Sequence, residues 1–414
     1  MHSVTEVARH DVWLYDRPVG HLLSHDNYTW FEFTEEYLSD PARPVLGLRF
    51  EENLRGRVAA NLRLPRWFSN LLPEGVLRDW IAAERGVARE RELELLEQVG
   101  HDLPGAVRVF AGGTRDDLRD LAEAPITGEP FTKTGHPDHR WRFSLAGVGL
   151  KFSMIKSGDR FTCTATGEGG DWILKLPDSH YRGVPLNEYT MMRFASSVGI
   201  EVPEVALVHR EQVESLPATV WPHSEDYAFA VRRFDRPVGV DAVHIEDFAQ
   251  VKSIYATQKY EGNFESIAGL AYRRHDRRAL EEFVRRLTFF VLIGNGDAHF
   301  KNWSLIYYDR RIPTLSPAYD IVATEPYRPA SDPEDLGLKF AGSRNFSTVR
   351  VRQFDRLGRK LGASAGLSDV AVETIDRVTE LWPQFEDELV ALPQVLSSVR
   401  AAIRARSASL LRAE

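Results

Sequence analysis

The sequence LIGNGDAHFKNW occupies residues 292–303, and the interpretation of the rest of the chain depends on it. It places Asp297 five residues before Asn302, with a histidine and a lysine between them. An apolar run with helical spacing precedes it, and a strand-like run at residues 303–308 follows it. The pattern therefore predicts a polar loop that a rigid helix presents, which is how functional side chains are held in place.

This spacing of an acid and an amide meets two requirements of phosphoryl transfer to a hydroxyl. A carboxylate at Asp297 can orient the attacking hydroxyl and accept its proton, and the amide oxygen of Asn302 can hold Mg²⁺ on a nucleotide. Protein kinases use the same offset in their catalytic loop. A second acid, Asp320, follows in the stretch LSPAYDI, where a further metal ligand is expected. Without Asp320, the loop sequence could equally be a polar turn between a core helix and a strand. The presence of Asp320 at the expected position makes this alternative less favoured.

The helix that carries this loop is predicted from its apolar stripe. Apolar residues recur at i, i+3, i+4, i+7, i+10 and i+11, which places them on one buried face. The stripe stops at Gly294, directly before the loop. Its members are Leu280, Phe283, Val284, Leu287, Phe290 and Val291.

Two upstream stretches offer groups that could bind or organise nucleotide phosphates. WILKLP, residues 172–177, predicts a short strand with Lys175 in its interior, from which the lysine could neutralise phosphates. On an edge strand the same lysine would point to solvent. Asn187 and Glu188 open a predicted helix, where Glu188 could pair with Lys175 or serve only the helix N-terminus.

A glycine pair and a later strand complete the candidate nucleotide site. Gly147 and Gly149 allow a tight turn whose backbone N–H groups could face phosphates, although a plain hairpin turn is the more frequent cause of such a pair. Residues 227–237 predict a strand that leads into a helical region. Kinases place the backbone that contacts adenine at such a junction.

The hydrophobic and charged fractions are those of an ordinary globular protein. The length of 414 residues suggests two or three domains. The net charge of -8 argues against a dedicated nucleic-acid binder. The single cysteine, Cys163, cannot form an internal disulfide and excludes a cysteine-based zinc site, which fits a reducing cytoplasm. The sequence shows neither a signal-peptide pattern nor an apolar run of the ~18 residues that a membrane span needs. We therefore expect a cytoplasmic protein without a membrane partner.

Taken together and in order, the motifs resemble those of the HipA family of bacterial serine/threonine kinases, the toxins of HipBA-type toxin–antitoxin systems. The resemblance spans nearly the whole chain, including VWLY at residues 12–15 and LLPEG at residues 71–75. The motifs that carry it are SLAG at residues 144–147, WILKLP at 172–177, NEY at 187–189, RFDR at 233–236, GNGDAHFKN at 294–302 and YDI at 319–321.

The resemblance implies an α+β fold with a protein-kinase-like core of two lobes. The N-lobe is expected to be β-rich and the C-lobe all-helical, and an N-terminal α/β subdomain is added to them. The expected boundaries are residues 1–112 for the N-terminal subdomain, 113–237 for the N-lobe and 238–414 for the C-lobe.

The resemblance also implies a role for each matching residue. Asp297 would be the catalytic base, Asn302 and Asp320 the Mg²⁺ ligands, and Lys175 the lysine that binds ATP phosphates with Glu188 as its helix partner. Ser144 would be autophosphorylated, and Phe234 and its neighbours would line the adenine pocket. Gly149 departs from the family, where many members carry glutamine. The further residues assigned to nucleotide binding are Ala146, Gly147, Val148, Gly149, Lys151, Arg233, Phe234, Asp235 and His299.

The implied function is an ATP- and Mg²⁺-dependent protein kinase that causes growth arrest and persistence. Its implied substrate is an aminoacyl-tRNA synthetase, with glutamyl-tRNA synthetase as the first candidate. Its implied partner is a HipB-like helix-turn-helix antitoxin, through which alone it would reach DNA. Two alternatives stay open: a small-molecule or lipid kinase on the same core, and an inactive kinase-like co-repressor.

Overall fold

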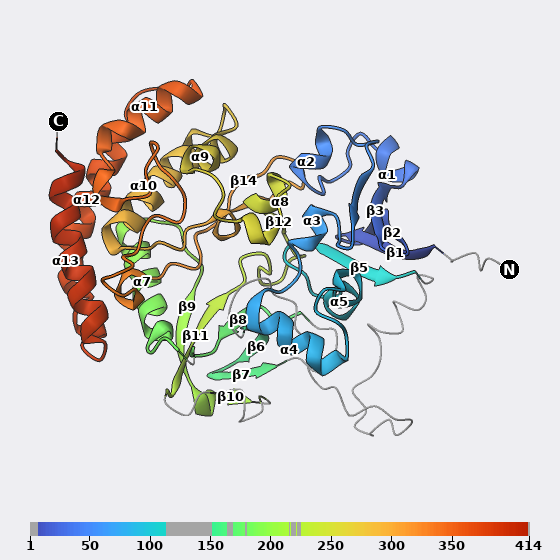
Figure 1. The fold of residues 1–414 in the computed structure, drawn as a ribbon, viewed down its shortest axis with the longest axis horizontal. Coiled ribbons are helices and arrows are strands. Elements are labelled where there is room, and N and C mark those ends of the chain that lie inside the picture. Colours follow the sequence, from blue (N-terminus) through green and yellow to red (C-terminus); the bar gives the residue numbers. More distant parts are fainter. Residues whose placement is uncertain are drawn as a thin grey trace.

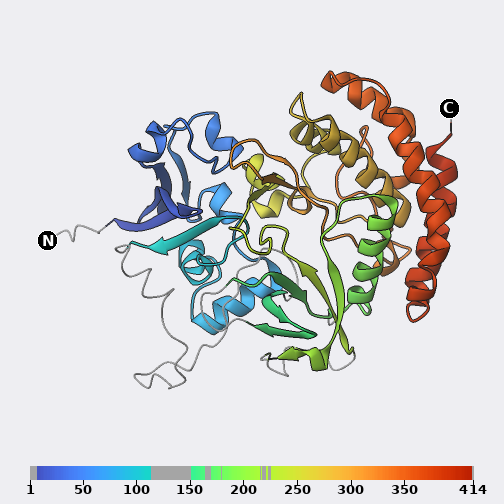
Figure 2. The same cartoon turned by 180° about the vertical axis from the view of Figure 1, so that it is seen from behind.

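The computed structural model describes residues 7–112 and 151–412, apart from 164–168, 179, 215, 217–220 and 222–224. Three regions follow one another across the molecule: a sheet with short helices, a second sheet in the middle, and a group of long helices at the C-terminal end (Figure 1). The view from behind shows the same order (Figure 2). Within the described ranges, no helix has both the length and the apolar character needed to span a bilayer.

The N-terminal region is built on a five-stranded antiparallel sheet with the order β4-β3-β2-β1-β5. Alternating burial along β1 places Val12 and Leu14 in the core, as the two-residue period of a strand requires. The strands are β1 (Ala8–Leu14), β2 (Arg17–His25), β3 (Tyr28–Phe33), β4 (Val58–Asn61) and β5 (Val107–Ala111). The helices are α1 (Glu35–Ser39), α2 (Leu48–Glu51), α3 (Arg66–Ser69), α4 (Gly75–Arg85) and α5 (Glu92–Val99).

The central region is a six-stranded sheet with the order β10-β7-β6-β8-β11-β9, in which β8 is an interior strand. Only β10 and β7 pair in parallel among its described neighbours. Helix α7 (Val184–Val198) lies against β9 and β11. The strands are β6 (Lys151–Ser157), β7 (Arg160–Cys163), β8 (Trp172–Lys175), β9 (Val205–His209), β10 (Val213–Glu214) and β11 (Tyr227–Arg232).

The two faces of the central sheet belong to different hydrophobic cores. Trp172 and Leu174 of β8 join the core that also contains Val12 of the N-terminal sheet. Ile173, between them, packs against the core of the helical region. Because side chains alternate along a strand, Lys175 lies on the face of β8 that is turned to the helices. The domain boundaries expected after residues 112 and 237 stay predictions.

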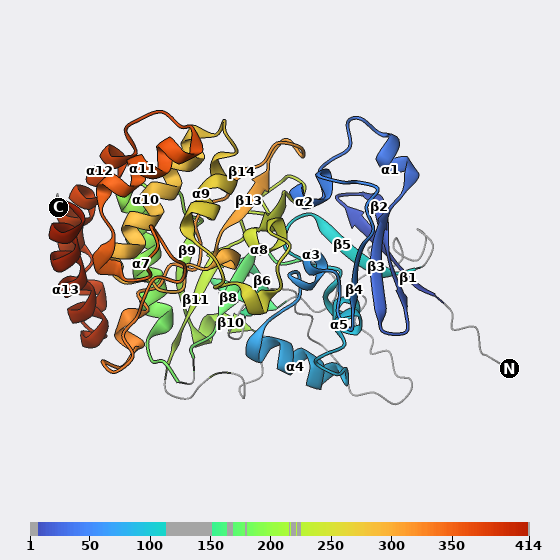
Figure 3. The same cartoon turned by 45° about the horizontal axis from the view of Figure 1, so that its top comes forward.

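The C-terminal region is organised around α10 (Arg277–Ile293). Asp276 caps its start, with the Ala279 N–H donating to Asp276 Oδ1 at 2.9 Å, and Gly294 ends it at φ 73°. All six residues of the predicted stripe are at most 4 % exposed, which confirms this helix. Figure 3 shows α10, α11, α12 and α13 together at the end of the molecule far from the N-terminus.

The remaining helical elements are short segments around the loop and long helices behind it. The α-helices are α8 (Phe248–Val251), α9 (Phe264–Tyr272), α11 (Val351–Leu361), α12 (Leu367–Leu381) and α13 (Pro393–Leu410). Single 3₁₀ turns cover Arg210–Gln212, Ala256–Gln258, Phe300–Asn302, Glu325–Tyr327, Phe346–Thr348, Trp382–Gln384 and Asp387–Leu389.

The α+β class and the β-rich lobe beside a helical lobe are confirmed, but the C-lobe is not all-helical. The strand-like run predicted at residues 303–308 is confirmed by β13 (Ser304–Tyr307). The strands β12 (His244–Asp247) and β14 (Thr314–Leu315) were not expected in the C-lobe, and they pair with β13 in a small antiparallel sheet. His244 and Glu246 are fully buried, and the residues between and after them are partly exposed, as in a strand. Four residues are too few for this alternation to stand out beside the helical pattern that follows.

Candidate active site

The loop after α10 is held in shape by its own side chains and by its neighbours. The Asp297 N–H donates to Asn295 Oδ1 at 2.9 Å, and Asn302 Nδ2 donates to the Asp297 carbonyl oxygen at 2.7 Å. The Gly296 N–H donates to Thr324 Oγ1 at 2.7 Å. These hydrogen bonds fix the backbone of Asp297 relative to the side-chain amide of Asn302, which helps to place the two functional groups for joint action.

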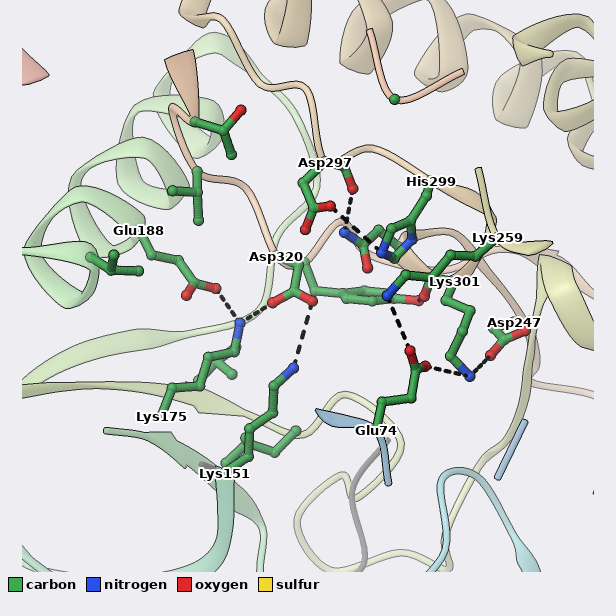
Figure 4. A pocket seen from close by; sticks show the side chains of 18 of the residues that line it. Glu74, Lys151, Lys175, Glu188, Asp247, Lys259, Asp297, His299, Lys301 and Asp320 are labelled. Carbon is green, nitrogen blue, oxygen red and sulfur yellow. Dashed lines mark hydrogen bonds and ion pairs between the residues drawn. The ribbon is translucent and has the colours of Figure 1, made fainter. Parts of the chain in front are cut away.

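Lys175 joins segments that lie far apart in the sequence. Its ammonium group forms ion pairs with Glu188 of α7 and with Asp320. Lys151 lies directly opposite Lys175 in the ladder of β6 and β8, so both lysines extend from the same face, and Lys151 Nζ is 3.7 Å from Asp320 Oδ2. Figure 4 shows the two ammonium groups meeting at Asp320 while Glu188 approaches Lys175 from the helix.

These contacts decide between interpretations that the sequence left open. Lys175 is not on an edge strand, because β8 is paired on both sides, and its side chain is 15 % exposed. Helix α7 begins at Val184, so Asn187 and Glu188 lie inside it and do not cap it. Asn187 is fully buried and exchanges hydrogen bonds with the backbone of Ala323. Glu188 is therefore left to pair with Lys175.

Burial and the paired charges together set the pKa values in this cluster. Burial raises the pKa of Glu188 to about 7, and Lys175 offsets only part of that effect. Burial lowers the pKa of Lys151, whereas for Lys175 the opposite effect of Asp320 and Glu188 is larger and its pKa is raised. Burial would also raise the pKa of Asp320, but Lys151 and Lys175 hold it far below its usual range. Asp320 is therefore ionised and Lys175 charged at neutral pH.

Asp320 also has an unusual backbone conformation. Its φ is 58°, in the left-handed region that costs free energy for residues other than glycine, although aspartate tolerates it better than most. The preceding residue holds the turn, since the Tyr319 hydroxyl is 2.5 Å from Ser304 Oγ and donates to the Lys301 carbonyl oxygen at 2.9 Å. Conformations of this kind persist where the surroundings fix them, and they cluster at functional sites.

Asp297 has a different environment from Asp320. Its side chain is 50 % exposed, its Oδ1 accepts a hydrogen bond from the Tyr260 hydroxyl, and His299 Nε2 lies 3.7 Å from the same oxygen. Partial burial raises the pKa of Asp297, and the hydrogen bond from Tyr260 opposes that effect. Burial lowers the pKa of His299 to about 3, and nearby Lys259 adds to the effect, so the imidazole is neutral at pH 7.

The predicted site residues that the structure describes line one cavity of about 790 Å³. This volume is typical of sites for small molecules and cofactors. Ten predicted residues are on its wall: Lys151, Lys175, Glu188, Arg233, Phe234, Asp235, Asp297, His299, Asn302 and Asp320.

Arg233 and Asp235 lie on this wall, but their side chains are engaged in a buried network. Arg233 is 2 % exposed and donates to Asp102 Oδ1 at 2.7 Å and to Asp235 Oδ2 at 2.9 Å. Arg236 donates to the same oxygen of Asp235 at 2.8 Å and to the Leu103 carbonyl oxygen at 3.0 Å. The network ties the central sheet to the N-terminal region, so a contact of these side chains with nucleotide stays a prediction.

The donor groups at the loop fit a magnesium ion that is shared with phosphates. Within the described ranges, no group of three or more His, Cys, Asp or Glu side chains could hold a metal ion by itself. Mg²⁺ does not need one, because it usually keeps several waters and takes one or two carboxylates plus phosphate oxygens. Asp320 is ionised. The side-chain nitrogen of Asn302 donates a hydrogen bond to the Asp297 carbonyl oxygen, so the side-chain oxygen Oδ1 is the atom that can bind a cation.

Some predicted residues fall where the structure gives no description. Ser144, Ala146, Gly147, Val148 and Gly149 lie outside the described residues. Their assignment to phosphorylation and to the phosphate loop stays a prediction.

Comparison with known proteins places the chain in a family. A family model described as the HipA-like C-terminal domain matches residues 143–382, and one described as the HipA N-terminal domain matches residues 10–110. The chain belongs to the HipA family. It is 41 % identical over 401 residues to the Y4dM protein of Sinorhizobium fredii, which covers 94 % of this chain and 95 % of that protein.

Two comparisons with HipA of Shewanella oneidensis, one of sequence and one of structure, extend the result to a kinase and to the fold. The serine/threonine-protein kinase toxin HipA is 27 % identical over 287 residues, or 62 % of each chain. A solved structure of HipA with HipB and operator DNA matches with a TM-score of 0.70 at 21 % identity, covering 97 % of this chain and 96 % of that one. This likeness confirms the HipA fold, with its kinase-like pair of lobes, over nearly the whole chain.

The HipA-family site also contains residues that the sequence did not indicate. Asn70, Glu74, Asp247, Lys259 and Tyr260 line the same cavity. Glu74 belongs to LLPEG, which served only to recognise the N-terminal subdomain. A charged residue directly before a helix is normally explained as a capping residue, so its position in the sequence carried no sign of a role near Asp297.

Proposed function

We propose that this HipA-family protein is an ATP- and Mg²⁺-dependent serine/threonine protein kinase and the toxin of a type II toxin–antitoxin system. The observation that carries the proposal is the meeting of Lys175, Glu188, Asp320, Asn302 and Asp297 at one cavity. Phosphoryl transfer needs groups for the nucleotide phosphates, for the metal and for the acceptor hydroxyl in one place. These five side chains include at least one for each task.

Each of these side chains has a defined part in the proposed transfer. Lys175, kept charged by Glu188 and Asp320, would neutralise the α- and β-phosphates. Asp297 would accept a hydrogen bond from the acceptor hydroxyl and then its proton, while the γ-phosphoryl group leaves the β-phosphate oxygen and joins the hydroxyl oxygen. The carboxylate of Asp297 is half exposed, which suits a hydroxyl that belongs to another protein.

Asp320 and Asn302 are the proposed ligands of magnesium. Bound Mg²⁺ bridges phosphate oxygens and neutralises the charge that develops on them. Lys151 and His299, which lie on the same wall, would complete the nucleotide site together with the chain around Phe234. Backbone N–H groups of the phosphate loop proposed at residues 146–149 would bind the phosphates.

The proposed protein substrate is an aminoacyl-tRNA synthetase, with glutamyl-tRNA synthetase as the first candidate. The proposed partner is a HipB-like helix-turn-helix antitoxin, and this is supported by the Shewanella oneidensis structure, in which HipA occurs with HipB and operator DNA. The net charge of -8 agrees with contact to DNA through the antitoxin and not through this chain.

The test is transfer of labelled phosphate from ATP to purified aminoacyl-tRNA synthetases, compared with small hydroxyl compounds and lipids. Asp297→Asn should reduce transfer by about 10²- to 10⁴-fold, the usual contribution of a general base. Asp376→Asn, on the exposed face of α12, is the matched control and should leave transfer unchanged. Transfer by Asp297→Asn within tenfold of wild type contradicts the assignment. Transfer only to small compounds indicates a small-molecule or lipid kinase, and failure to bind ATP indicates a co-repressor.

We further propose that Ser144 is autophosphorylated and that this silences the enzyme. Phosphorylation adds nearly two negative charges, which would repel ATP phosphates from the loop. Peptide mass spectrometry after incubation with Mg-ATP, followed by assay of the modified protein, tests this. Active enzyme without phosphate on Ser144 contradicts it.

A further inference from the structure

Glu74 lies where the N-terminal region meets the loop that carries Asp297. It directly precedes α4, in the N-cap position, yet its carboxylate makes no capping hydrogen bond to the described backbone of that helix. Glu74 Oε2 is instead 3.1 Å from Lys259 Nζ, and its Oε1 is 3.4 Å from Lys301 Nζ. Figure 4 shows the carboxylate between these two lysines, below the loop.

Lys301 anchors the second half of the loop to the N-terminal region. Its ammonium group is buried and lies 2.8 Å from the Asn70 carbonyl oxygen, 3.2 Å from Asn70 Oδ1 and 3.0 Å from Asp247 Oδ2. A buried ammonium group is tolerated only with such partners. Because Lys301 directly precedes Asn302, these contacts also set the position of the proposed magnesium ligand.

Lys259 belongs to a segment that lies against the loop at both Asp297 and Phe300. The Phe300 N–H donates to the Lys259 carbonyl oxygen at 3.2 Å, and the hydroxyl of the next residue, Tyr260, donates to Asp297 Oδ1. The contact is close, since a Cβ added at Gly262 would lie 2.5 Å from Phe300 Cε2. Glu74 therefore holds the side chain of a segment that itself touches the proposed base.

We propose that Glu74 is a positioning residue for phosphoryl transfer. It fixes Lys301, which is in the loop, and Lys259, which is in the segment packed against the loop, so that the N-terminal region completes the site to which Asp297 and Asn302 belong. This inference rests on the proposed kinase function. Burial would raise the pKa of Glu74, but Lys301 and Lys259 hold it below its ordinary value, which keeps the carboxylate ionised for both contacts.

The expected consequence is a loss of turnover without a matching loss of nucleotide binding. Glu74→Gln keeps the size of the side chain but removes its charge, so the lysines lose their shared partner and the loop is less fixed. Misplacement of reacting groups by about 1 Å can cost roughly 10²-fold in rate. We expect kcat to fall by ~10- to 100-fold and KM for ATP to change by less than about threefold, because Lys175, Glu188 and Lys151 belong to other elements.

The matched control is Glu246→Gln at the same junction. Glu246 is fully buried and accepts hydrogen bonds from the Leu48 N–H at 2.9 Å, from Trp67 Nε1 at 3.2 Å and from the Tyr307 hydroxyl. It thus links the N-terminal region to the small sheet and not to the loop. Its replacement should lower the melting temperature and leave kcat within about threefold of wild type.

The decisive experiment measures kcat, KM for ATP and backbone amide exchange of residues 295–302 in wild type, Glu74→Gln, Glu246→Gln and Lys259→Met. We expect Glu74→Gln and Lys259→Met to reduce kcat and to speed exchange in the loop, with Glu246→Gln close to wild type in both. Unchanged kcat in Glu74→Gln, or an equal fall in Glu246→Gln, overturns the proposal.

The exchange measurement separates this inference from the proposed function. If wild-type protein transfers no phosphate to any acceptor, the proposed function fails, and exchange still decides the role of Glu74. Faster exchange at residues 295–302 in Glu74→Gln but not in Glu246→Gln then supports a positioning role, and equal exchange in all variants overturns it.

Discussion

Lys175 lies between two carboxylates, Glu188 and Asp320, and each of the three groups depends on the others. Taken alone, any of them would favour its neutral form, because burial penalises a charge. Lys151, opposite Lys175 on the neighbouring strand, places a second amino group beside Asp320. Added phosphates could therefore take over the contacts that the lysines make with Asp320.

The first prediction concerns nucleotide binding by Lys175. Lys175→Met should remove most of the rise in melting temperature that Mg-ATP causes, because that rise depends on the dissociation constant for the native state. Lys156→Met is the control: this lysine is on β6, the strand next to the β8 strand of Lys175, but it lies over the Trp172 ring at 4.7 Å and is not among the described residues that line the cavity. If Mg-ATP raises the melting temperature equally in wild type, Lys175→Met and Lys156→Met, then Lys175 does not bind phosphate.

The second prediction concerns Glu246 and pH. Burial raises the pKa of Glu246 from 4.5 to about 7, so between these values the native state binds a proton that the unfolded state has lost. The stability that this carboxyl contributes is complete below about pH 4.5 and is lost as pH rises through about 7. A pKa shift of this size corresponds to roughly 3 kcal/mol of stability between the two pH limits.

Glu246→Gln cannot lose that proton, so its stability relative to wild type should increase from pH 5 to pH 8. Chemical denaturation of both proteins at several pH values measures the difference. A difference in unfolding free energy that stays constant over this range would contradict the raised pKa of Glu246.

Among the elements, α10 matters most for the site because its end sets the start of the loop. Gly294 ends it at φ 73°, and a Cβ there would lie 2.6 Å from Glu325 Oε2 and 3.1 Å from Arg406 Nη1. Gly86 ends α4 with a similar φ of 65°, but a Cβ there would meet nothing within 4 Å. The two glycines separate the cost of the backbone conformation from the cost of the contact.

The third prediction follows from this comparison. Gly86→Ala should destabilise the protein by about 1–2 kcal/mol through its left-handed backbone alone. Gly294→Ala should cost at least about 1 kcal/mol more, since overpacking adds to the strain, and should also lower phosphoryl transfer because the loop shifts. Melting temperatures and transfer rates of both variants check this. If Gly294→Ala and Gly86→Ala lose the same amount of stability, the side chains of Glu325 and Arg406 move away from the new methyl group at no cost in free energy.

The elements differ in how well the sequence predicted them, for a physical reason. Helix α10 was predicted because its apolar stripe repeats over three turns, and the loop because Asp297 and Asn302 are close in sequence. Strand β12 was not, because its pattern covers four residues and its partner β13 lies beyond α10. Lys175 was recognised as a candidate because a lysine inside an apolar strand is conspicuous, although only the sheet order showed that the strand is interior.

At the scale of the whole molecule, the buried network around Arg233 is a polar link between regions. Arg233 pairs with Asp235 in its own segment and with Asp102 of the N-terminal region. The same two regions share the hydrophobic core that includes Trp172 and Leu174. The N-terminal and central regions should therefore unfold together.

The fourth prediction tests this link. Arg233→Met should destabilise the protein by about 3–5 kcal/mol, the usual cost of removing one member of a buried ion pair. Arg232→Met is the control. The side chain of Arg232, the residue before Arg233, is 31 % exposed and pairs with Glu204 at 3.1 Å. Removing this partly exposed ion pair should cost less than about 1 kcal/mol. Chemical denaturation measures both. Losses of similar size would show that the network adds no more than a surface ion pair.

The part of the site that depends on the whole molecule could not be predicted. Glu74 and Lys259 are 185 positions apart, and no local pattern in either segment indicates that they meet. The same holds for Asp102 and Arg233, whose pairing depends on how the N-terminal region rests on the central sheet. Contacts inside one element follow from its periodicity, whereas contacts between regions need the complete three-dimensional arrangement.

The central sheet serves a different core on each of its faces, and this limits how family members can be recombined. A chimera that exchanged only residues 1–112 with those of a relative would set a foreign surface against Trp172 and Leu174, which were shaped for the native one. Side chains on the other face of the same strands, Ile173 among them, would need no change. Successful exchange should therefore transfer alternate residues of β6, β8 and β11 along with the N-terminal segment, and leave the residues between them in place.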